Sequence, residues 1–65
     1  MTVKYPDIAV QLTGRDGNAM SIVSTVAAAL RRNGHRDEVD AFVHEALSGD
    51  YDNVIATAAR WVDVS

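Results

Sequence analysis

Two helical patterns of apolar residues stand only three residues apart in the second half of the chain. Residues 36–48 and 51–62 each carry a stripe at the spacing of one helix face, formed by Val39, Phe42, Val43, Ala46 and Leu47 and by Tyr51, Val54, Ile55, Ala58 and Val62. Gly49 ends the first helix, and Asp50 is a good N-cap for the second. Because so short a linker leaves no other choice, the two helices must form a tight hairpin.

A further helix is predicted before this hairpin, over residues 19–33. Every position of its stripe is apolar: Ala19, Ile22, Val23, Val26, Ala27 and Leu30. Asp16 or Asn18 can cap its start, and Gly34 stands where a left-handed stop residue belongs. Its first residues also suit a β-hairpin, but the alanine run and the complete stripe favour the helix.

An alternating pattern over residues 8–13 predicts one short strand, with Ile8, Val10 and Leu12 on its apolar face. Pro6 fits only before this strand or at a sheet edge. The strand needs a hydrogen-bonding partner. That partner is either the C-terminal tail, where Val62, Asp63 and Val64 alternate, or the same strand of a second copy. We favour the second copy, because the last helical stripe runs through Val62 and leaves only three residues for a tail strand.

The sequence therefore predicts a mainly α (α+β) fold, in which one strand and three helices form a single domain over residues 1–65. This length lies near the lower limit for an unaided core, so a homodimer would enlarge it. The absence of Cys excludes disulfides and thiolate metal sites. The longest apolar run, residues 26–30, is too short for a membrane span and no signal peptide is recognisable, so we expect a cytoplasmic protein.

The candidate chemical sites are weak. The stretch TGRDGNA, residues 13–19, could hold an anion at a helix start, but it lacks the spacing of known phosphate loops and Asp16 would compete for the same amides. His44 shares a face with Asp40 and roughly with Asp37, which offers a single nitrogen ligand and no firm metal site. A helical core this small also leaves little room for a pocket of about 300 Å³ or more. We therefore expect no enzyme, no cofactor and no metal.

Charge is distributed unevenly along the chain. Residues 15–36 hold four arginines against one acid, whereas residues 37–52 hold six acids and neither Lys nor Arg. Most of these charges suit helix ends, which leaves Asp40, His44 and Glu45 as free surface. The candidate interaction residues are these three together with Ile8, Val10 and Leu12 of the strand. The aromatic residues are assigned to the core: Tyr5, Phe42, Tyr51 and Trp61.

The motifs QLTGRDGNA, SGDYD and RWVDV resemble a group of short uncharacterised bacterial proteins, often from actinobacteria and their phages. This resemblance covers nearly the whole chain and implies no function. In architecture the chain also resembles ribbon-helix-helix repressors, which pair one strand from each of two copies. It departs from them in its long first loop, its third helix and a strand face, formed by Ala9, Gln11 and Thr13, that lacks Arg and Lys.

The function expected from the sequence is a non-enzymatic protein-interaction module. We expect it to bind itself, as a homodimer, and an unidentified protein. The alternative is a ribbon-helix-helix-like DNA-binding regulator. Nucleic acid is the weaker partner because the net charge is −3, with six Lys and Arg residues against nine acids.

Overall fold

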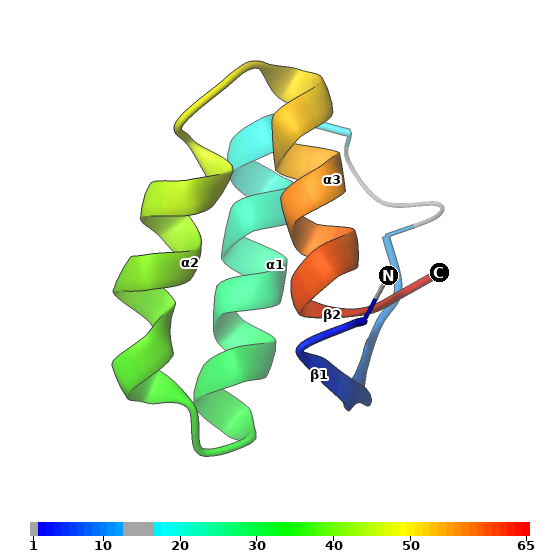
Figure 1. The fold of residues 1–65 in the computed structure, drawn as a ribbon, viewed down its shortest axis with the longest axis vertical. Coiled ribbons are helices and arrows are strands. Elements are labelled where there is room, and N and C mark those ends of the chain that lie inside the picture. The colour runs from blue at the N-terminus through cyan, green and yellow to red at the C-terminus, as the bar shows by residue number, and fades with distance from the viewer. Residues whose placement is uncertain (1, 13–16) are drawn as a thin grey trace.

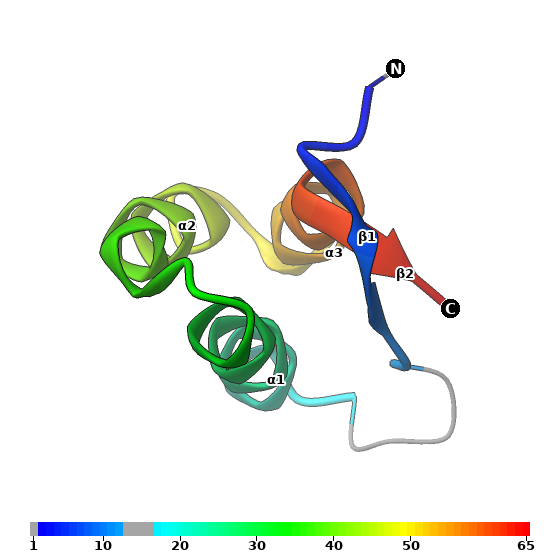
Figure 2. The same ribbon diagram turned by 90° about the horizontal axis from the view of Figure 1, so that it is seen from below.

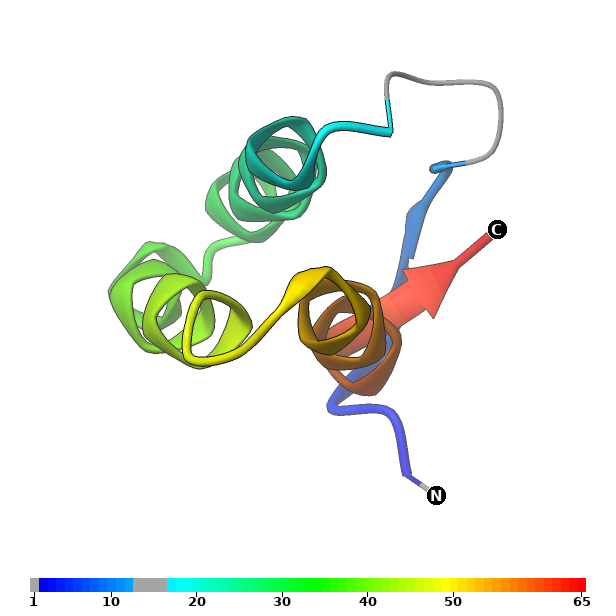
Figure 3. The same ribbon diagram turned by 90° about the horizontal axis from the view of Figure 1, so that it is seen from above.

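The computed structural model describes residues 2–12 and 17–65 of the chain. Its elements follow the order β1 (Tyr5–Val10), α1 (Ala19–Arg32), a 3-10 turn (Arg36–Glu38), α2 (Val39–Ala46), α3 (Tyr51–Trp61) and β2 (Val62–Val64) (Figure 1). Viewed along the helices, α1, α2 and α3 form a triangle, and the strand pair lies against α1 and α3 (Figures 2 and 3). The predicted mainly α fold, with one N-terminal strand and three helices, is confirmed.

The partner of β1 is the chain's own tail. β2 runs parallel to it, with Tyr5 opposite Val62 and Val10 opposite Val64. Beyond the strands, the Ser65 N–H donates to the Val10 carbonyl at 3.0 Å and the Leu12 N–H donates to the Ser65 carbonyl at 2.8 Å. The sequence had favoured a second copy in this place. The tail holds it because α3 ends at Trp61, and Val62, which is extended and fully buried, begins the strand.

The first strand also lies earlier than expected, at Tyr5–Val10 rather than at residues 8–13. Pro6 falls inside the strand, where the register is irregular between Tyr5 and Ala9. Proline has no N–H to donate, so it fits this irregular stretch of a two-stranded sheet. The alternating face is as predicted: Ile8 and Val10 are buried in the core, and Leu12 is half-buried.

Both ends of α1 are fixed by hydrogen bonds between residues that are close in the sequence. The Asn18 side chain accepts a hydrogen bond from the Met20 N–H at 2.9 Å, while the other expected cap, Asp16, lies outside the described residues. At the far end the His35 N–H bonds to the Leu30 carbonyl at 2.8 Å and the Gly34 N–H to the Arg31 carbonyl at 3.2 Å. This double closure requires a left-handed residue, and Gly34 supplies it with φ of 83°.

The hairpin of α2 and α3 is tight, as predicted, although α2 is shorter than the expected 36–48. A 3-10 turn precedes it, and the helix ends at Ala46. The Asp50 side chain caps α3 by accepting from the Asn53 N–H at 3.0 Å. The Asn53 side-chain amide reaches back and donates to the Glu45 and Ala46 carbonyls at 2.9 and 3.1 Å, so α3 caps the end of α2.

Phe42 and Trp61 form the aromatic centre of the core, as predicted. Their ring centroids lie 5.5 Å apart, edge to face, which is a favoured aromatic geometry. Tyr51 is a correction: it is 47% exposed, and its hydroxyl donates to the Gly17 carbonyl at 2.6 Å. Tyr51 therefore lies at the surface, where its hydroxyl ties the start of α3 to the segment before α1. Along the described residues, every helix is too short or too polar to cross a membrane.

Candidate interaction surface

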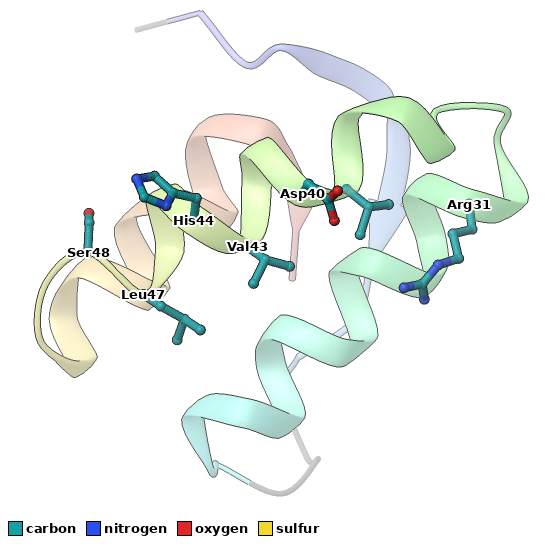
Figure 4. Close-up of a pocket in the computed structure, with 7 residues that line it drawn as sticks. Arg31, Asp40, Val43, His44, Leu47 and Ser48 are labelled. Carbon is teal, nitrogen blue, oxygen red and sulfur yellow. The ribbon is translucent and has the colours of Figure 1, made fainter.

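An open groove of about 560 Å³ runs between α1 and α2 (Figure 4). It is larger than the pocket volume expected for so small a core, because it is a hollow on the surface rather than a cavity within the bundle. α1 contributes Arg31, and α2 with the turn after it contributes the other lining residues: Val39, Asp40, Val43, His44, Leu47 and Ser48. The groove therefore follows one face of α2 for its whole length.

The apolar part of the groove comes from a single row on α2. Val39, Val43 and Leu47 follow each other at intervals of four residues, so they lie along one ridge of the helix. In Figure 4, Val43 and Leu47 point from α2 toward α1, whereas His44 and Ser48 point away from it. Leu47 is 46% exposed, so at this end of the row a large apolar side chain lies open to solvent.

The groove also carries two charges of opposite sign. Arg31, on α1, and Asp40, on α2, both line its end near the 3-10 turn. The structure records no ion pair for either side chain with any described residue, although both are exposed. Each is therefore available to a partner molecule.

The cleft between α2 and α3 is closed, in contrast. Arg60 of α3 pairs with Glu45 of α2 at 3.2 Å, and its guanidinium also donates to the fully buried Thr57 hydroxyl at 3.1 Å. Asn53 adds its two hydrogen bonds to the end of α2. On the side of α1 and α3 the strand pair packs against both helices, and a second hollow lined by Ile22, Tyr51 and Ile55 among others stays open beside it.

The predicted interaction residues are divided among these regions. Asp40 and His44 are exposed and lie together in the groove, whereas Glu45, expected to be free surface, is held by Arg60. Ile8 and Val10 are 2% and 5% exposed, so the chain's own core takes up their side chains. Leu12 lines a second, mainly apolar hollow of about 370 Å³, with Tyr51, Ile55 and Val64 among its other walls.

A charged and aromatic cluster lies where β1 meets the α1–α2 connection. The Lys4 ammonium is 2.8 Å from the Glu38 carboxylate, which also accepts a hydrogen bond from the Tyr5 hydroxyl at 3.0 Å. The Tyr5 ring stacks on His35 with centroids 4.1 Å apart, and the Lys4 ammonium lies 4.2 Å from the centroid of the Trp61 ring. These contacts fasten Lys4 and the first residue of β1 to the α1–α2 connection and to the end of α3, which gives the cluster a structural role.

The ionisation of this cluster follows from its hydrogen bonds. The bond from Lys4, followed by the one from Tyr5, lowers the pKa of Glu38. The same bond to Glu38 raises the pKa of Lys4. Desolvation, followed by the bond to Glu38, raises the pKa of Tyr5. All three groups are thus held in the charge states that they have at neutral pH.

Five residues that line the groove were not identified as site residues from the sequence: Arg31, Val39, Val43, Leu47 and Ser48. Arg31 had been assigned to the helix end, where a cation suits the dipole, and Val43 and Leu47 had been assigned to the core stripe. One signal could have marked the two apolar residues: the stripe of residues 36–48 is wider than one neighbouring helix can cover. Within the described part of the chain, no group of three or more His, Asp or Glu side chains is placed to hold a metal ion.

Comparison of the chain with protein-family models, curated proteins and solved structures gave no match. The resemblance to short actinobacterial and phage proteins therefore stays a prediction. The fold differs from that of ribbon-helix-helix repressors in how its first strand is paired. In this fold β1 pairs in parallel with a strand of its own chain, whereas such repressors pair one strand from each of two copies.

Proposed function

We propose that this chain is a small non-enzymatic interaction module of the cytoplasm that associates through the α1–α2 groove, and that one of its partners is a second copy. The observation that carries this proposal is the open cleft. The chain's own groups close the α2–α3 cleft, and the strand pair covers part of the α1–α3 side. The α1–α2 groove, in contrast, exposes Leu47 and two charges that have no ion pair among the described residues. Grooves of this kind receive the apolar face of a helix.

The polar groups of the groove support a non-catalytic role. Asp40, His44 and Ser48 follow each other on one side of α2, which would be suggestive of a nucleophile with its base. The Ser48 hydroxyl, however, donates to the Glu45 carbonyl at 2.7 Å. No hydrogen bond links Ser48 to His44, or His44 to Asp40, in the described structure. A nucleophile without an adjacent base is weak, so hydrolysis has little support here.

The DNA-binding alternative has less support than the interaction module. The exposed side of β1 presents Ala9, and neither β1 nor β2 contains an arginine or lysine. Lys4, just before β1, is engaged by Glu38. A gel shift with random duplex DNA at low salt tests this alternative. A regulator that neutralises DNA phosphates would form a complex whose affinity falls as the salt concentration rises. We expect no such complex with this chain.

The experiment that tests the proposed function is size-exclusion chromatography with light scattering, from low micromolar to millimolar protein. We expect the mass to approach that of a dimer, and Leu47→Arg to abolish this association. Ile55→Arg is the matched control, since Ile55 is another exposed apolar residue but lies outside the groove. A display library of helical peptides, screened against the same three proteins, tests for other partners. A monomeric parent that also selects no peptide sensitive to Leu47→Arg would overturn the proposal.

A further inference from the structure

We propose that the second copy docks on the α1–α2 groove about a two-fold axis parallel to the helices, which places Arg31 of each chain against Asp40 of the other. This inference rests on the proposed function and deepens it. The groove faces of the two chains would meet, with α1 of one copy against α2 of its partner. The product is a four-helix arrangement at the centre of the assembly.

The charges of the groove favour a copy of this chain as its occupant. Arg31 and Asp40 line the same end of the groove, and neither is paired within the described chain. A groove whose charges all had one sign would require a partner of the opposite charge. A groove that carries one cation and one anion at the same level is instead complementary to itself, because a two-fold rotation about its length exchanges the two walls.

The apolar residues fit the same symmetry. Rotation about an axis parallel to the helices keeps each residue at its own level, so Val43 and Leu47 face the same residues of the partner chain. The half-buried Val43 and the exposed Leu47 would then lie at the centre of the interface, which is where buried anchors contribute most to affinity.

The facing wall of α1 leaves room for this approach. Helix geometry places Ser24 and Ala28 on the same side of α1 as Arg31, at the i−7 and i−3 positions. Ser24 is exposed and Ala28 is half-buried, and neither carries a bulky side chain. The partner's α2 can therefore come close to α1 without displacing any large residue.

The decisive test is a charge exchange between two variants, Arg31→Asp and Asp40→Arg, followed by native mass spectrometry. Each variant alone would place two pairs of like charges across the axis, so we expect its dimer to weaken by more than about tenfold. When the two variants are mixed, both cross-axis pairs become attractive, and we expect a heterodimer of one chain of each. Arg32→Asp is the control, because Arg32 is exposed, unpaired among the described residues and outside the groove.

A second test does not depend on charge. The chain contains no Cys, so Leu47→Cys introduces a single thiol close to the proposed axis. We expect mild oxidation to join two such chains, whereas Ile55→Cys joins none under the same conditions.

The inference is overturned if the single charge variants dimerise like the parent, if their mixture stays monomeric, or if Leu47→Cys forms no covalent dimer. A dimer that Leu47→Arg abolishes, but that ignores both charge reversals, would overturn this geometry and leave the proposed function standing. A parent that is monomeric at every concentration, yet selects peptides through Leu47, would also remove the second copy and keep the module.

Discussion

The clefts on the two sides of α2 differ in how many side-chain contacts the chain makes across them. Toward α3, α2 is tied by the Glu45–Arg60 ion pair and by the side chain of Asn53, and Phe42 meets Trp61 beneath these contacts. Toward α1, the same helix exposes Leu47 and leaves Asp40 without a partner among the described residues. One short helix therefore has a side that is tied by polar contacts and a side on which the Leu47 and Asp40 side chains lack them.

This difference shows where a chain of 65 residues can place a functional surface. A domain this small has few apolar contacts to spare, so an exposed Leu47 beside the half-buried Val43 is costly unless another molecule covers it. The side toward α3 is held by an ion pair and by side-chain hydrogen bonds to the end of α2. The side toward α1 is thereby available for recognition, and each variant below changes one side and leaves the other intact.

The largest effect is expected at the closed side, from Trp61→Ala. Trp61 is buried between Phe42 and the strand pair, so its removal should cost about 3–5 kcal/mol of unfolding free energy, which is enough to unfold a domain this small. Urea denaturation followed by circular dichroism measures this, since the substitution also removes the only tryptophan. Trp61→Phe, which keeps an aromatic ring, should lose clearly less. A variant that melts like the parent would place Trp61 outside the core.

A smaller loss is expected from Asn53→Ala, which removes the amide that caps α2. The Ala46 carbonyl would lose its side-chain donor, and the Glu45 carbonyl would keep its donors from Ser48, at a cost of about 1–2 kcal/mol. The same denaturation experiment measures this loss. Ala56→Ser, an exposed change on the same helix, is the control and should stay within about 0.5 kcal/mol. Equal stability of Asn53→Ala and the parent would mean that the α2–α3 cleft is held by its apolar contacts alone.

The helices of this fold could be predicted because their signals are local. The stripes give the helix faces, Asn18 and Asp50 cap their own helices, and Gly34 closes α1 through its left-handed backbone. The end of α2 could not be predicted, because its cap comes from a side chain of α3. The same is true of the strand partner. Val62 is buried whether it ends a helix or begins a strand, so its apolar character did not distinguish the two.

The groove could not be predicted for a similar reason. Its existence depends on how much of each stripe the neighbouring elements cover, and its two charges come from different helices. Asp40 and His44 were recognised as surface residues because no helix end explains them. Arg31 was not, because its position at the end of α1 already had a sufficient explanation.

A modest, pH-dependent effect is expected from Glu38→Gln at the junction of β1 and the helices. The folded state lowers the pKa of Glu38, so this carboxylate stabilises the fold above its ordinary pKa, and the contribution is lost as the pH falls through the folded-state pKa. Thermal melts at neutral and acidic pH should therefore show a parent that loses stability on acidification and a variant that loses less. Asp37→Asn, a neighbouring exposed acid, is the comparison. Parallel losses in parent and Glu38→Gln would show that other carboxylates carry the acid sensitivity.

The smallest effect on folding is expected from Leu47→Ala. A small effect would show that the side of α2 toward α1 does not need the Leu47 side chain to fold. Leu47 is 46% exposed, so truncating it removes few contacts and should change the unfolding free energy by no more than about 0.5 kcal/mol at concentrations where the chain is monomeric. Val39 provides the contrast. It belongs to the same row but is 6% exposed, so Val39→Ala should cost about 1–3 kcal/mol. If Leu47→Ala proved as damaging as Val39→Ala, the open side would be part of the core. The groove would then not be an interaction surface, because the fold itself would need the Leu47 side chain.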